Sequence, residues 1–237
     1  MRKILPFLFL LGVSWFLGAC NPKDEPTDNN VSAADGVVNQ HGYVDLGLPS
    51  GTLWAICNLG ASKPSDKGHY YAWGETTTKS DYTWDTYKWV SEPNEYSLTK
   101  YCHDEQSGAV DNLWQLETMD DAARAAWGVD WRIPTDDEWS ELSQECTFAI
   151  IQHQGVLGCL ITGPNGKTIF LPAAGLKEGK AVQNDNVLGF YWTANTAIDY
   201  SYQAFYSHFD QEDYWGTSYQ IDRCMGGSVR PVLDVSE

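Results

Sequence analysis

The segment Trp131–Leu142, which reads WRIPTDDEWSEL, constrains the fold more than any other part of the chain. Thr135 is a favourable helix N-cap, and Glu138 stands three residues later, so the two side chains can form a reciprocal capping box. Asp136 and Asp137 add negative charge to the first helical turn, where the helix dipole stabilises it. We therefore predict a short helix with a fixed entry angle.

Helical periodicity extends this segment and marks a second one. After the capping box, four residues at helical spacing share one inward face, namely Trp139, Leu142, Ser143 and Cys146. A second capped helix is predicted over residues 118–128, where Thr118 and Asp121 repeat the capping spacing and Gly128 suits the C-terminal end. Its inward stripe consists of Met119, Ala122, Ala123 and Ala126.

The N-terminus predicts export and lipid attachment. Residues 1–19 form a signal peptide, because a charged start is followed by an apolar run too short to span a bilayer. The residues before Cys20 resemble a lipobox, which implies that Cys20 is lipidated, and residues 21–25 resemble the surface-export signal of Bacteroidetes lipoproteins. An ordinary signal peptide and a merely polar linker are the alternatives. We predict a surface-exposed, lipid-anchored protein of the cell outer membrane.

After the signal peptide, residues 20–40 predict a flexible tether and residues 41–237 a single domain. The formal net charge of −17 repels nucleic acid and anionic membrane surfaces, so we predict no nucleic-acid partner. Neutral glycans, proteins and cations remain compatible. The eleven Trp, thirteen Tyr and eight Phe are many for 237 residues, and aromatic side chains serve both cores and binding surfaces.

Cysteine and histidine spacing matches no zinc or iron site, and we predict no cofactor. The histidines are scattered without a ligand spacing, and no cysteine pair resembles a zinc site. An odd number of cysteines follows Cys20, so at least one stays unpaired within the chain. The sequence leaves the pairing open among Cys57, Cys102, Cys146, Cys159 and Cys224, as it does calcium binding and the oligomeric state.

Short alternating segments predict many antiparallel strands. The expected strands are residues 43–46, 52–59, 69–74, 158–162, 167–171, 189–194, 202–209, 220–223 and 228–232. An Asn-Gly turn at residues 163–166 predicts a hairpin, and residues 75–112 predict a long ordered loop that carries function or decoration. Two helices among such strands predict an α+β fold.

Several sequence blocks resemble the Fibrobacter succinogenes major paralogous domain family. The blocks occur in order at residues 45–55, 72–75, 120–123, 131–135, 170–175, 191–193 and 228–232. The central block is also similar to the formylglycine-generating-enzyme superfamily. The resemblance implies a C-type-lectin-like fold, with two short helices packed on twisted antiparallel β-sheets. It also implies a binding surface built from the C-terminal strands and their loops. That superfamily's oxidase activity needs a late cysteine pair, whereas this chain has only Cys224 there.

An aromatic tract at residues 199–219 is the best candidate ligand surface. In an extended strand over residues 202–209, Phe205 and Phe209 face one way while the other aromatic side chains face the opposite way. One set must be core, and the other can form an exposed platform. The candidate ligand-binding residues are Tyr200, Tyr202, Tyr206, His208, Tyr214, Trp215 and Tyr219. Burial of both strand faces by packed sheets is the alternative.

Charged residues elsewhere favour structural roles. Arg132 and Arg230 have acidic neighbours and predict buried ion pairs. Glu75 could act with Asp136 or Glu138 as a hydrolase pair, although Glu138 is already engaged in capping. We interpret three further acidic motifs as coincidental or solvated rather than cation-binding, namely the lectin-like triplet 92–94, the stretch 184–186, and the loop of Asp210, Glu212 and Asp213.

The sequence therefore predicts a non-catalytic adhesion or recognition module that binds a glycan or protein ligand. A structural or tip subunit of a surface fibre is one alternative, and a carbohydrate-active hydrolase is the other.

Overall fold

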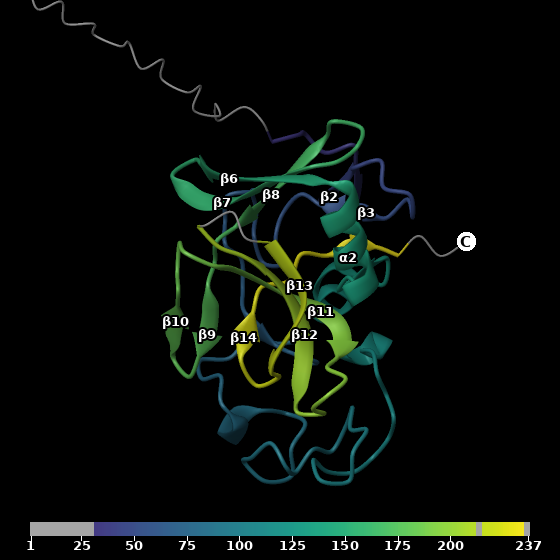
Figure 1. Cartoon of the computed structure of the whole chain (residues 1–237), viewed down its shortest axis with the longest axis vertical. Coiled ribbons are helices and arrows are strands. Elements are labelled where there is room, and N and C mark those ends of the chain that lie inside the picture. The colour runs from purple at the N-terminus through teal and green to yellow at the C-terminus, as the bar shows by residue number, and fades with distance from the viewer. Residues whose placement is uncertain (1–30, 212–214, 235–237) are drawn as a thin grey trace, which may run out of the picture.

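A computed structural model describes residues 31–211 and 215–234, and this part of the chain is mostly β (Figure 1). Strands and bridges account for 37% of the described residues and helical turns for 11%, in four sheets with two α-helices. The α+β, C-type-lectin-like prediction is therefore wrong. The two predicted helices form but are short, and the strands at residues 147–153, 176–178 and 181–183 were not predicted.

The strands form four separate antiparallel sheets. The five-stranded sheet has the order β1 (Gly36–Val38), β2 (His41–Asp45), β3 (Leu53–Ala55), β15 (Val232–Leu233) and β5 (Trp131–Arg132). The four-stranded sheet has the order β10 (Ala181–Gln183), β9 (Leu176–Glu178), β14 (Gly226–Gly227) and β4 (Tyr71–Ala72). The two three-stranded sheets are β6 (Thr147–His153), β7 (Val156–Thr162) and β8 (Thr168–Pro172), and β11 (Gly189–Thr196), β12 (Gln203–Phe209) and β13 (Trp215–Asp222).

The folded part begins within the segment predicted as a tether. Strand β1 pairs with β2 in the register Val37 to Gly42. Farther upstream, the backbone nitrogen of Ser32 donates to Oγ1 of Thr168, 2.9 Å away. These contacts place part of the 20–40 segment against the domain.

The predicted helix at residues 118–128 consists of two pieces. A 3₁₀ turn, η2, covers Thr118–Asp120, and α1 covers Ala122–Trp127. Asp121, rather than Thr118, is the N-cap of α1, and its carboxylate accepts from the backbone nitrogens of Ala123 and Arg124. Met119 is 86% exposed and does not belong to the inward face.

Helix α2 (Asp136–Glu145) forms as predicted, with a capping box between Thr135 and Glu138. The helix lies beside β11–β13 (Figure 1), and Trp139 and Leu142 on its inner face are fully buried. The Trp139 ring contacts that of Trp54 at a centroid distance of 4.7 Å and that of Tyr191 at 5.8 Å. Trp139 thus joins the five-stranded sheet to β11–β13 in one core.

The two arginines predicted to form buried ion pairs, Arg132 and Arg230, have different partners. Arg132 makes the predicted ion pair, because its two terminal nitrogens each lie 2.7 Å from a carboxylate oxygen of Glu138. For Arg230 the prediction of an ion pair is wrong. Its fully buried guanidinium donates to oxygens of Asn58, Ala55 and Phe170 at 2.8–3.0 Å, none of which belongs to a carboxylate. Arg230 therefore ties three backbone segments together through neutral acceptors.

Replacing Glu138 by Gln is expected to lower the free energy of unfolding by about 1–3 kcal/mol at pH 7, because charge-assisted hydrogen bonds are lost. Although burial alone would raise it, the Arg132 guanidinium and the Thr135 donors hold the pKa of Glu138 below its ordinary value. A carboxyl with a depressed folded-state pKa stabilises the fold above its unfolded-state pKa, and this contribution falls as the pH drops through the folded-state pKa.

Urea unfolding of both forms at pH 7 and pH 3 measures this difference. The gap between the wild type and Glu138→Gln should shrink at pH 3. An equal gap at both pH values would contradict the assigned role of the ionised carboxylate.

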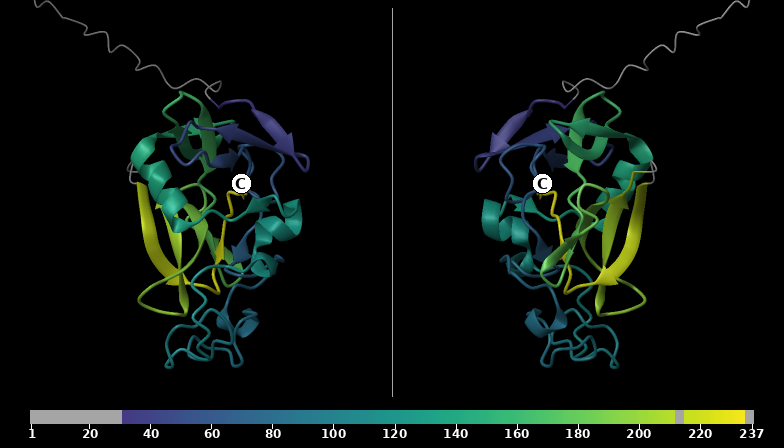
Figure 2. Two further views of the ribbon diagram at one scale, coloured as in Figure 1. Left: turned by 90° about the vertical axis from the view of Figure 1, so that its right-hand side faces the viewer. Right: turned by 90° about the vertical axis from the view of Figure 1, so that its left-hand side faces the viewer.

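A long loop at residues 75–121, which includes the loop predicted at residues 75–112, occupies one end of the molecule (Figure 2). Within this loop the structure describes two 3₁₀ turns, η1 at Trp84–Thr86 and η2. The buried carboxylate of Asp120 accepts from the ammonium groups of Lys88 and Lys100 and from the hydroxyl of Tyr101. These bonds hold the loop in one conformation and so position the site described next.

Candidate functional site

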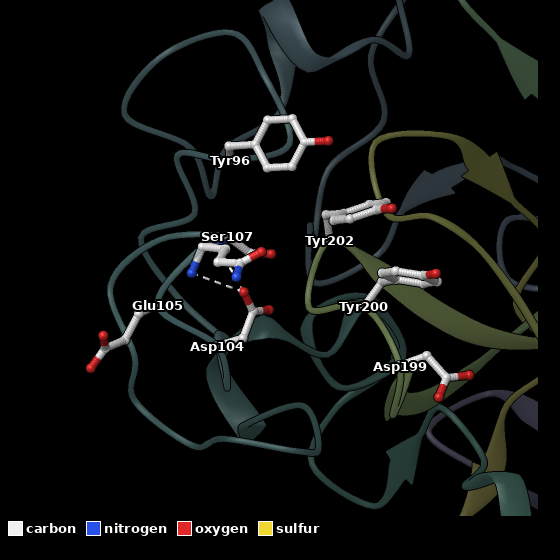
Figure 3. A pocket seen from close by; sticks show the side chains of 8 residues that line it. Tyr96, Asp104, Glu105, Ser107, Asp199, Tyr200 and Tyr202 are labelled. Carbon is white, nitrogen blue, oxygen red and sulfur yellow. Dashed lines mark hydrogen bonds between the residues drawn. The ribbon is translucent and has the colours of Figure 1, made fainter.

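A pocket of about 530 Å³ lies where the long loop meets the connection between β11 and β12 (Figure 3). We call it the tyrosine pocket. The loop contributes Tyr96 and residues 104–107, and the β11–β12 connection contributes Asp199, Tyr200 and Tyr202. The pocket thus combines two segments about a hundred residues apart in sequence.

Three tyrosine rings dominate the pocket wall. The rings of Tyr200 and Tyr202 are 5.4 Å apart at an angle of 33°, and the rings of Tyr96 and Tyr202 are 6.2 Å apart at 68°. Tyr200 and Tyr202 lie one beside the other in Figure 3, with Tyr96 across from them. Tyr96 is 61% exposed and Tyr200 is 52% exposed, so their faces are available to a ligand.

Ser201 joins the two segments of the pocket. This residue is fully buried between Tyr200 and Tyr202. Its hydroxyl donates to Oδ2 of Asp104 at 2.6 Å and accepts from the backbone nitrogen of His103 at 3.0 Å. The tyrosines on either side of Ser201 are therefore fixed relative to the loop.

Asp104 is an ionised group at the pocket wall. Besides Ser201, its carboxylate accepts from the backbone nitrogens of Ser107 at 2.8 Å and Gln106 at 3.0 Å. Although burial acts to raise the pKa of Asp104, these hydrogen bonds hold it below its ordinary value. Asp104 therefore carries negative charge at neutral pH.

The loop that carries Tyr96 contains the lectin-like triplet 92–94. The side chain of Asn94 accepts from the backbone nitrogen of Tyr96 at 2.9 Å, and Ser97 Oγ donates to the carbonyl of Glu92 at 2.6 Å. The triplet thus shapes the turn that presents Tyr96.

In the described part of the chain, no group of three or more His, Cys, Asp or Glu residues is placed to hold a metal ion.

Five of the seven predicted ligand residues fall into two groups. Tyr200 and Tyr202 line the tyrosine pocket, whereas Tyr206, His208 and Tyr219 form a separate cluster on β12 and β13. In this cluster the His208 and Tyr219 rings are 4.6 Å apart, and Tyr206 stacks on Phe190 at 4.2 Å. Tyr206 and His208 are half-buried, so this face of the sheet is only partly open.

The remaining two predicted ligand residues are Tyr214 and Trp215. Tyr214 lies outside the described residues. Trp215 was expected to be exposed but is largely covered, because its ring stacks on Phe148 at 4.5 Å and on Phe209 at 6.1 Å. On one face of β12, Phe205 and Phe209 are buried, and on the opposite face Tyr206 and His208 are half-buried.

The carboxylates considered for hydrolysis make structural contacts elsewhere. Glu75 is buried and pairs with the Lys79 ammonium at 2.8 Å, while Asp136 accepts from Ser218 Oγ at 2.6 Å. In the stretch 184–186, Asp185 pairs with Lys67, and Asn186 accepts from the backbone nitrogen of Leu157. Of the acidic loop considered for a cation, Glu212 and Asp213 lie outside the described residues.

Four buried cysteines, Cys57, Cys102, Cys146 and Cys224, are free thiols. Burial raises the pKa of Cys146 to about 11 and that of Cys224 to about 12. The thiols of Cys146 and Cys224 are therefore protonated and poorly reactive.

A second, smaller pocket of about 330 Å³ lies beside the stacked rings of His41 and Trp127.

Sequence reasoning missed Tyr96 and residues 104–107. The signal was present in the long loop, which is polar and aromatic and was predicted to be ordered. The contact of this loop with the β11–β12 connection is set by tertiary packing, which leaves no periodic pattern in the sequence.

Comparison of the chain with models of known protein families, with curated proteins and with solved structures found no match. Among residues 31–211 and 215–234, no helix is long and apolar enough to cross a membrane.

Proposed function

We propose that this protein is a non-catalytic cell-surface lipoprotein that binds a glycan or protein ligand in the tyrosine pocket. The proposal includes lipidation at Cys20, attachment to the outer membrane, and membership of the Fibrobacter succinogenes major paralogous domain family. The lipobox-like residues and the ordered sequence blocks support those parts. The binding role rests on the pocket.

The observation that carries the binding role is the exposure of Tyr96 and Tyr200 around a concave, pre-formed space. Large aromatic rings exposed together usually mark recognition, because they offer contact area at little conformational cost. Ser201 and Asp104 hold the two sides of the pocket in place before any ligand arrives, which lowers the entropy lost on binding.

The state of Asp104 favours binding over glycoside hydrolysis. A glycosidase needs one carboxylic acid with a raised pKa to protonate the leaving group. In the tyrosine pocket the pKa of Asp104 is lowered instead, and both of its carboxylate oxygens already accept hydrogen bonds. This carboxylate is thus suited to holding the pocket together.

The test applies the full-length chain to a glycan array and to an array of purified surface proteins. Replacing Tyr200 by Ala should weaken binding by about tenfold or more, because a central aromatic contact is lost. Tyr219→Ala is the matched control, since Tyr219 is an exposed tyrosine of the separate cluster and should leave binding within about twofold.

Other outcomes separate the alternatives. Binding that survives Tyr200→Ala but is lost in Tyr219→Ala would move the site to the β12–β13 cluster. Capture of a fibre-shaft protein that is unaffected by either change would support a structural subunit. Turnover of any polysaccharide would contradict the non-catalytic role.

A further inference from the structure

We infer that the tyrosine pocket recognises an organic ammonium group, such as that of choline, a lysine side chain or an amino sugar. This inference rests on the proposed function, because it names the ligand chemistry of the same pocket. It is carried by two independent observations: the arrangement of the three rings and the sign of the surrounding charges.

The planes of the three rings are inclined to one another. Tyr202 is the shared neighbour, with Tyr200 inclined at 33° to it and Tyr96 at 68°. A flat sugar is best matched by one broad ring face, whereas a compact cation is attracted by the negative faces of several inclined rings at once. The angles at Tyr202 therefore suit a cation better than a planar stack.

All formal charges among the described lining residues of the pocket are negative. Its eight described lining residues include three carboxylates, those of Asp104, Glu105 and Asp199, and no Lys, Arg or His. Glu95 and Asp222 add negative charge near the Tyr202 hydroxyl. In Figure 3, Glu105 and Asp199 point outward from the rings on opposite sides, while Asp104 lies between them.

This charge pattern discriminates between ligand classes. The rim carboxylates attract a cation over distances of about one Debye length, roughly 8–10 Å at physiological ionic strength. An anionic ligand is repelled by the same field, and a neutral sugar gains nothing from it. An ammonium group is attracted both by the rim and by the rings.

The decisive experiment compares choline with its uncharged isostere 3,3-dimethylbutanol. Each is titrated by calorimetry into the purified full-length chain. The two molecules share shape and apolar surface, so their difference isolates the positive charge. We expect choline to bind about tenfold more tightly. Equal affinities, or no binding of choline, would overturn the inference.

Variants show where choline binds, and they separate the contribution of the Tyr200 ring from that of its hydroxyl group. Tyr200→Leu should weaken choline binding by about tenfold, whereas Tyr200→Phe should stay within about twofold because the ring face remains. Tyr219→Leu serves as the control outside the pocket. Glu105→Gln removes one rim charge and should weaken binding by about twofold. Because Tyr200 is half-exposed, these variants should keep the thermal midpoint of the wild type.

Further titrations distinguish the source of the ammonium group. Nα-Acetyl-lysine amide and glucosamine carry it, whereas Nα,Nε-diacetyl-lysine amide and N-acetylglucosamine do not. Only the charged member of each pair should compete with choline. A neutral glycan or peptide that binds and is lost in Tyr200→Leu would overturn the ammonium inference but leave the proposed function intact. Failure of every ligand at the pocket would overturn both.

Discussion

Replacing Arg230 by Met should lower the free energy of unfolding by at least about 3 kcal/mol. Arg230 is fully buried, and its guanidinium satisfies oxygens of Asn58, Ala55 and Phe170. A methionine of similar length leaves these three acceptors without donors, at a cost of about 1–3 kcal/mol each. Release of a buried charge offsets part of this loss, so the net effect is smaller than the sum.

Urea denaturation followed by tryptophan fluorescence measures this change. Arg230→Lys keeps the charge but not the planar fork of donors, so it should also destabilise the protein substantially. Lys63→Met is the control, because Lys63 is exposed and should change stability by less than about 0.5 kcal/mol. If Arg230→Met is as stable as the wild type, the guanidinium does not hold the three segments together.

Replacing Trp139 by Ala should cost about 3–5 kcal/mol, in the range of large-to-small core substitutions. Trp139 is fully buried, and its ring lies against those of Trp54, Tyr191 and Trp215. Its removal opens a cavity at the point where α2, the five-stranded sheet and β11–β13 meet. The surrounding rings are held by separate elements and can close the cavity only partly.

Two further variants show whether the effect comes from lost volume. Trp139→Phe retains most of the ring and should cost about 1–2 kcal/mol. Trp114→Ala removes a tryptophan that is partly exposed and should cost less than Trp139→Ala. A loss in Trp139→Ala no larger than that in Trp114→Ala would place the core contact elsewhere.

The elements predicted correctly are those fixed by neighbouring residues. Thr135 and Glu138 cap α2, and the Asn165–Gly166 turn joins β7 to β8, because each signal lies within a few residues of the element it controls. The missed strands β6, β9 and β10 pair with neighbouring strands in hairpins, but their local sequence signals are weak. Strand β6 follows α2 without a turn signal, and β9 and β10 are three residues each and contain no buried residue.

Only part of the candidate site was predicted from the sequence. The aromatic tract correctly drew attention to Tyr200 and Tyr202, since adjacent tyrosines near a turn are visible in sequence. Their partners Tyr96 and Asp104 belong to a loop whose position is set by buried groups such as Asp120 and Ser201. Trp215 was assigned to the surface because its flanking residues are polar, but tertiary packing covers its ring.

The place of β15 has a consequence for how the chain reaches its native state. This strand, at residues 232–233, is inserted between β3 and β5, where Val232 pairs with Trp54 and with Arg132. The centre of that sheet therefore stays open until almost the last described residue has been synthesised. Such distant pairing slows folding, because a long loop must close before the contact forms. A chain that stops before β15 lacks the strand that joins β3 to β5, so these two strands reach their native arrangement only once residues 232–233 are present.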